Sequence, residues 1–62
     1  MTDIRRRLKL ATEKLSDLEE QLAHAEHRAA AGDAEAAAER IELLDEIEAQ
    51  KTVIRDLEGQ LP

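Results

Sequence analysis

The sequence predicts an all-α protein, in which an antiparallel helical hairpin dimerises into an antiparallel four-helix bundle. Ala, Leu, Glu, Arg and Lys dominate the 62 residues and aromatic residues are absent, which is a composition typical of long helices. Apolar residues recur at helical spacing through the first half, and a Gly-Asp pair interrupts them at mid-chain. We therefore expect one domain over residues 1–62, with a helix over 3–31, a turn at 32–33 and a helix over 34–58.

Apolar residues in the first half follow an unbroken heptad pattern, with alternating steps of four and three. The eight core positions are Ile4, Leu8, Ala11, Leu15, Leu18, Leu22, Ala25 and Ala29. This spacing places all of them on one stripe of a helix. Thr2 is predicted to cap the start of this helix, with Asp3 in its first turn.

Gly32 and Asp33 are predicted to form a very short turn between two helices. Glycine readily adopts the left-handed conformation that ends a helix. Asp33 can then cap the second helix, and Glu35 complements its positive end. The alternative is one long helix that tolerates Gly32 at a cost of about 1 kcal/mol. An unbroken heptad would then place poor core residues in line, namely Gly32, Glu39, Glu46 and Gln60 together with Val53.

A hairpin gives a better core when the chain is folded about the bond between residues 32 and 33. Residues whose numbers sum to 65 then face each other, in the layers Ile4–Leu61, Leu8–Leu57, Ala11–Ile54, Leu15–Gln50, Leu18–Ile47, Leu22–Leu43, Ala25–Arg40 and Ala29–Ala36. Six of the eight layers are wholly apolar. Gln50 and Arg40 interrupt the seam, and a polar core residue can fix the register of pairing. The flanking pairs Arg5–Glu58 and Arg28–Glu39 are attractive.

The apolar surface is wider than the seam of two helices requires. The residues predicted to form the core or a dimer interface are Leu15, Leu18, Leu22, Ile41, Leu43, Leu44, Ile47, Val53, Ile54 and Leu57. Ile41, Leu44 and Val53 lie beside the seam, and a two-helix seam leaves each leucine half exposed. We therefore expect self-association into a homodimer.

The charge distribution favours an antiparallel dimer. The chain carries a net charge of −6. Residues 1–14 and 51–62 hold seven basic and four acidic side chains, a net of +3, whereas residues 15–50 hold two basic and eleven acidic ones, a net of −9. In an antiparallel pair each basic end lies along an acidic half, and in a parallel pair like charges align.

The composition argues against catalysis, cofactors and metals. The chain has no cysteine for disulfide or thiolate chemistry and no glycine-rich phosphate loop, and no histidine lies near its serines or threonines. Glu20, His24 and His27 share one helix face but occupy outward positions, which favours exposed polar residues over a metal site. We expect a non-enzymatic, cytoplasmic protein that does not enter the membrane, because no apolar run of 18 residues occurs.

A basic cluster opens the chain and is the candidate for function. Its members, all candidate nucleic-acid contacts, are Arg5, Arg6, Arg7, Lys9 and Lys14. Such side chains bind phosphates, although no aromatic residue is present to stack on bases. A structural role is the alternative. Cations at a helix start oppose the helix dipole, so they can offset Asp56, Glu58 and the acidic half of a partner chain.

The layout resembles the Rop family of plasmid copy-number regulators. The heptads of residues 4–29, the turn "AGDAEAAAE" and the tail "LLDEIEAQKTVIRDLEGQL" carry this resemblance. It implies an antiparallel four-helix bundle that binds a paired-loop RNA through the exposed face of the first helix. With the turns superposed, the family's RNA-binding places fall at Arg5, Thr12, Ser16, Glu20 and His27. Arg5 alone keeps the family's character there.

Three functions are compatible with these observations. The first is a small regulator or adaptor that binds a structured RNA. The second is an acidic inhibitor of a basic protein, of the type encoded by phages or mobile elements, which would mimic nucleic acid. The third is a coiled-coil assembly module with a purely structural role.

Overall fold

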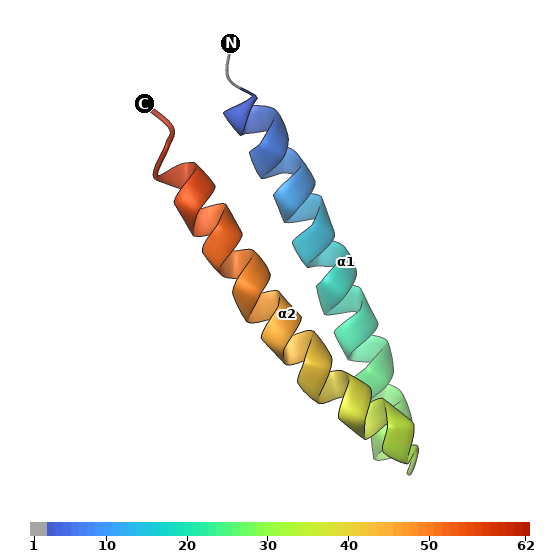
Figure 1. Cartoon of the computed structure of the whole chain (residues 1–62). Helices are drawn as coiled ribbons and strands as arrows, with labels where there is room; N and C mark the ends of the chain where they lie inside the picture. The colour runs from blue at the N-terminus through green and yellow to red at the C-terminus, as the bar shows by residue number, and fades with distance from the viewer. Residues whose placement is uncertain (1–2) are drawn as a thin grey trace.

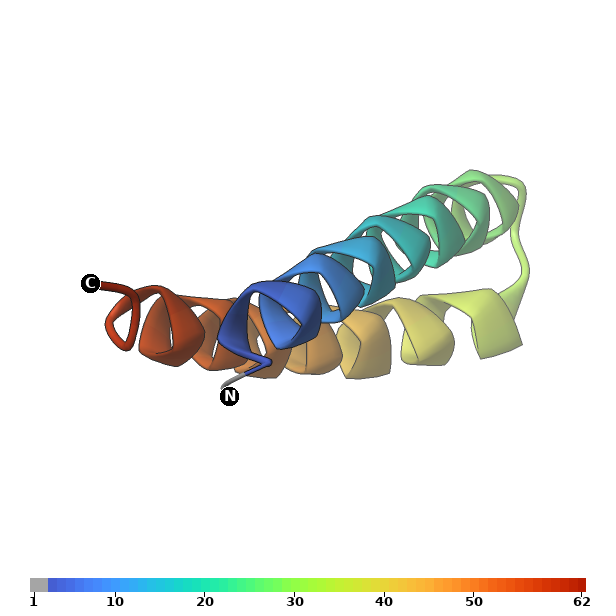
Figure 2. The same ribbon diagram turned by 90° about the horizontal axis from the view of Figure 1, so that it is seen from above.

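Two long helices joined by a tight turn make up the protein. The computed structural model describes residues 3–62, in which α1 (Ile4–Ala30) and α2 (Ala34–Glu58) run antiparallel and no strand occurs. The start of α1 and the end of α2 therefore lie at the same end of a rod measuring 49 × 14 × 12 Å (Figure 1). The helices stay side by side along their length, and a second view shows that their axes are inclined to each other (Figure 2). The predicted helical hairpin is confirmed.

The start of α1 has no side-chain cap within the described residues. Asp3 precedes the helix, and its backbone carbonyl accepts a hydrogen bond from the Arg7 amide at 2.7 Å, but its carboxylate caps no amide. The predicted cap, Thr2, lies outside the described residues. The first turn of α1 contains no acidic residue, whereas its last turn contains His27 and Arg28. The dipole of α1 is thus complemented at its C-terminus and opposed at its N-terminus.

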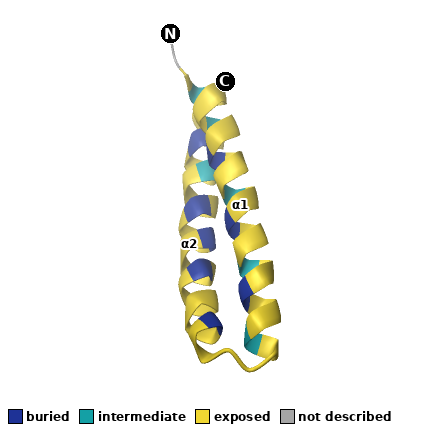
Figure 3. Cartoon of the chain, turned by 90° about the vertical axis from the view of Figure 1, so that its right-hand side faces the viewer, coloured by how far each residue is buried: buried dark blue, intermediate teal, exposed yellow. Residues whose placement is uncertain are grey.

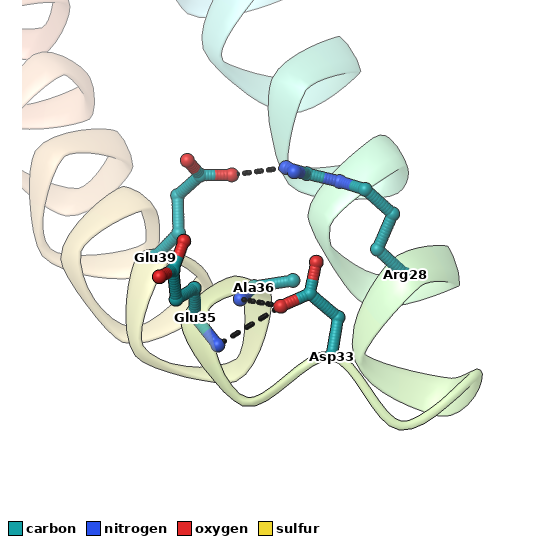
Figure 4. Close-up of polar contacts among 5 residues, drawn as sticks. All are labelled: Arg28, Asp33, Glu35, Ala36 and Glu39. Atoms are coloured by element: carbon teal, nitrogen blue, oxygen red, sulfur yellow. Dashed lines mark hydrogen bonds and ion pairs between the residues drawn. The ribbon is translucent and has the colours of Figure 1, made fainter.

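The turn combines a glycine with a capping aspartate. Gly32 has φ +103°, and its amide donates to the Ala29 carbonyl at 3.0 Å. One carboxylate oxygen of Asp33 accepts hydrogen bonds from the amides of Glu35 and Ala36 at 3.0 and 3.2 Å (Figure 4). Each residue satisfies backbone groups that a helix end leaves free, so the turn closes within a few residues.

The end of α2 is different, because Gly59 keeps a right-handed helical φ of −66°. Its amide donates to the Arg55 carbonyl at 3.0 Å, and the next two amides donate to the last carbonyls of the helix. The chain then leaves the helix and returns Leu61 to a half-buried position.

The seam between the helices is closed on one side and open on the other. The buried residues are Ala11, Leu18 and Ala25 on α1 and Ala36, Leu43, Ile47, Gln50 and Leu57 on α2, and they line the facing sides of the helices (Figure 3). Apart from Ile47, they form one heptad row. The other row contains the buried Ile47 and the exposed Arg40, and its remaining members are half-buried, namely Leu8, Leu15, Leu22, Ala29, Ile54 and Leu61. We call this second set the half-buried row.

Replacement of Gly32 by alanine should lower the free energy of unfolding by about 1–2 kcal/mol, because an L-residue is strained in the left-handed region. An added Cβ at Gly32 would meet no atom within 4 Å, so the loss would come from the backbone alone. Urea denaturation of G32A measures it.

The matched control is Gly59→Ala. An added Cβ there makes ordinary contacts, at 3.5 and 3.6 Å from two backbone oxygens. Because the φ of Gly59 suits any residue, G59A should be neutral or stabilising by up to about 1 kcal/mol. Equal losses in both variants would contradict a specific role for the turn glycine.

Candidate functional site

The basic cluster lies exposed on the first three turns of α1. All five of its cations are exposed. The ion pairs within residues 3–62 are Arg28–Glu39 and Lys51–Glu48, so no cation of the cluster pairs with another described residue. The expected attraction between Arg5 and Glu58 therefore produces no ion pair, because long exposed side chains gain little by giving up water. The cluster stays free to bind an anionic ligand.

The hairpin presents two different faces to solvent. Each residue lies about 100° further round a helix than the one before it. In an antiparallel pair of helices with this register, the side chains of the half-buried row lie on the same side of the hairpin in both helices. Leu44 lies next to them on that side. We call this side the leucine face. The other side, which carries the Arg28–Glu39 ion pair, is called the opposite face.

These two faces divide the basic cluster. By the same rotation, Arg5 and Lys9 lie at the edge of the leucine face. Arg7 and Lys14 lie on the opposite face, and Arg6 points away from the seam. The sequence pattern grouped the five cations because they are neighbours in the chain, but on the helix they follow separate directions.

Four large apolar side chains are exposed. On the leucine face, Leu44 is 42% exposed and Ile41, at its rim, is 61% exposed. On the opposite face, Val53 is 45% exposed and Leu10 is 56% exposed. Leu10 is not among the residues predicted for the core or the dimer interface, because it lies outside the heptad positions. Its position between Arg7 and Lys14 is the feature of the sequence that could have pointed to it.

The ten residues predicted for the core or dimer interface separate into three groups. Leu18, Leu43, Ile47 and Leu57 are buried within the hairpin. Leu15, Leu22 and Ile54 are half-buried. Ile41, Leu44 and Val53 remain exposed.

Gln50 is the one buried polar side chain among the described residues. It is 8% exposed, and its Nε2 donates a hydrogen bond to the Ala11 carbonyl at 2.9 Å, across the seam from α2 to α1. A shift of one helix along the other would break this bond and leave a buried amide unsatisfied. Arg40, the other polar residue of the seam, is exposed. Gln50 therefore fixes the register of the two helices.

Arg28 and Glu39 form the predicted flanking ion pair near the turn (Figure 4). Their side chains are about half exposed, at 50% and 48%, so we expect a small contribution to stability. The pair shows that the two helices meet in the register that the sequence predicts.

No three His, Asp or Glu side chains within residues 3–62 are placed to hold a metal ion. Glu20, His24 and His27 are all exposed. No helix in the same range is long and apolar enough to cross a membrane.

Comparisons with protein-family models, with curated proteins and with solved structures find no match to this chain. The resemblance to the Rop family is therefore one of architecture, and the structure supports it as far as the helical hairpin.

Replacement of Gln50 by leucine should raise the free energy of unfolding by about 1 kcal/mol. Leucine burial contributes about 1.5–3 kcal/mol, and the lost hydrogen bond contributes roughly 0.5–1.5 kcal/mol. The Ala11 carbonyl lies inside α1, so the helix still provides it with a donor. Urea denaturation measures the change.

Gln50→Ala serves as the control, since it removes the bond without adding apolar burial and should be destabilising. A loss of stability in Q50L comparable to that in Q50A would show that the amide–carbonyl bond outweighs leucine burial at this site.

Proposed function

We propose that the protein is a non-enzymatic homodimeric regulator, in which two hairpins form an antiparallel four-helix bundle that binds a structured RNA. The observation that carries the proposal is the exposed and unpaired basic cluster at the start of an otherwise acidic chain. Phosphates are the ligands that such a cluster attracts, because each contact releases condensed counterions. The architectural resemblance to the Rop family points to the same class of ligand.

Dimerisation is supported by the apolar surface that a single hairpin leaves in water. No large side chain among the described residues is fully buried, and the half-buried row and Leu44 remain accessible. A thin two-helix rod has too little interior to bury them. A second hairpin provides that interior, as four-helix bundles do.

Sedimentation equilibrium at micromolar concentration should return twice the mass of the 6.9 kDa chain. The relative orientation of the two hairpins can be measured from the distance between spin labels attached at Arg6→Cys in each chain, since the chain has no other cysteine. In an antiparallel bundle the two labels lie roughly 35 Å or more apart, from a rise of 1.5 Å per residue. A stable monomer would contradict the dimer, and a short label separation would contradict the antiparallel arrangement.

RNA binding can be tested by gel shift with two RNA hairpins paired through their loops, with a plain RNA duplex for comparison. Binding should weaken steeply as salt rises, because phosphate contacts release counterions. The triple variant Arg5/Arg6/Arg7→Ala should lose most of the affinity. If the wild-type protein shifts neither RNA, the proposed RNA binding is contradicted.

A second candidate is an acidic inhibitor of a basic protein. Residues 15–50 carry eleven acidic and two basic side chains, and apart from the Arg28–Glu39 and Lys51–Glu48 pairs their charges remain unpaired. Affinity capture with and without RNase distinguishes the candidates. Recovery of a basic protein that survives RNase favours the inhibitor.

A further inference from the structure

We propose that a second copy of the chain covers the leucine face, and that RNA phosphates are therefore bound on the opposite face by Arg7 and Lys14, with Arg6 beside them. This inference rests on the proposed dimer and on the proposed RNA binding. It differs from what the Rop resemblance implies, because the family's places at Arg5, Thr12 and Ser16 fall on or beside the leucine face.

The leucine face is the side of the hairpin on which a row of apolar side chains remains partly exposed. The row of residues that leans toward the opposite face is already buried, except for Ile4 at the open end. The half-buried row leans toward the leucine face along the whole rod, and Leu44 extends it. The opposite face offers only Leu10 and Val53, at one end. An apolar stripe that is interrupted only at Arg40 therefore exists on the leucine face and not on the opposite face.

Side-chain volume on this face changes along the rod. At the open end it carries Leu8, Ile54 and Leu61, and at the turn end it carries Ala29, Ala30 and Ala37 beside Arg40, while Leu15, Leu22, Ile41 and Leu44 lie between the two ends. An antiparallel second copy lays bulky residues against small ones at both ends. A parallel copy would crowd leucines at one end and leave voids between alanines at the other, and both errors are destabilising.

Charge at the edges of this face follows the same gradient. The open half carries Arg5, Lys9, Lys51, Arg55 and Glu58, a net of +3, and the half near the turn carries Glu19, Glu26, Glu48 and Arg40, a net of −2. Lys51 and Glu48 already pair with each other. Charges of opposite sign meet when the second copy is antiparallel. This complementarity identifies the occupant as another copy of this chain.

The dimer assigns separate tasks to the cations of the basic cluster. Arg5 and Lys9 then face the acidic half of the partner chain, where they contribute to association. Arg7 and Lys14 stay in water on the opposite face, one on each side of Leu10. A ligand with phosphates can approach them without displacing the partner.

The dimer face is tested with two matched variants on α2, Leu44→Ala and Val53→Ala. The side chains are similarly exposed in the hairpin, at 42% and 45%, but lie on different faces. L44A should raise the dimer dissociation constant about tenfold or more, because each dimer loses two leucine contacts. V53A should change it less than about threefold. Sedimentation equilibrium giving the reverse order would overturn the proposed face.

The RNA face is tested with two double variants, each lacking two cations. Arg7→Ala/Lys14→Ala should weaken binding of the paired RNA hairpins at least tenfold and reduce the slope of log affinity against log salt by about 2. Arg5→Ala/Lys9→Ala should weaken RNA binding clearly less than Arg7→Ala/Lys14→Ala when the protein concentration keeps it dimeric, and should raise the dimer dissociation constant.

The two proposals fail in different ways. Wild-type protein that binds no RNA removes the proposed function. RNA binding that is lost in R5A/K9A dimers and kept in R7A/K14A overturns this inference and leaves the proposed function standing. Circular dichroism of each variant establishes that the hairpin is still folded before either conclusion is drawn.

Discussion

The structure depends on one constraint, which is that the two helices of this hairpin bury one row of their heptad stripe and leave most of the other row partly exposed. In this hairpin the row around Ala11, Leu18 and Ala25 meets its counterpart on α2 and is buried. The other row stays half in water, because no third helix covers it. The closed row gives the hairpin its shape, and the open row gives it a face that another molecule can use. The fold and the proposed interaction surface thus have the same cause.

Polar residues restrict how this apolar seam can pair. The Gln50 amide holds α2 against α1 at one register through the Ala11 carbonyl, and the Arg28–Glu39 pair agrees with that register near the turn. Leucines alone would allow the helices to slide by a heptad at modest cost. The turn at Gly32 and Asp33 then sets the direction of the second helix, so register and direction are fixed at separate points along the rod.

The structure changes the interpretation of the basic cluster. If its cations paired with the acidic residues at the end of α2, those pairs would compensate the unfavourable interaction of the cations with the dipole of α1. None of its five cations forms such a pair with a described residue. All five are exposed, and Arg5, Arg6 and Arg7 lie in the first turn of α1, where the helix dipole repels cations. Cations that form no internal ion pair and oppose the helix dipole are not explained by the fold of one chain, which is why we propose a ligand or a partner for them.

The sequence alone was enough to predict the hairpin, because helical periodicity, a left-handed glycine and a capping aspartate are local properties. It also determined which residues form the seam and that Arg28 faces Glu39, because the position of the turn fixes the pairing. It did not determine which seam row is closed, that Gln50 reaches the Ala11 carbonyl, or that Leu10 stands exposed between two cations. Those features depend on the inclination of one helix against the other and on the direction of each side chain around its own helix. Only the packed pair of helices decides them, since the heptad pattern treats both seam rows alike.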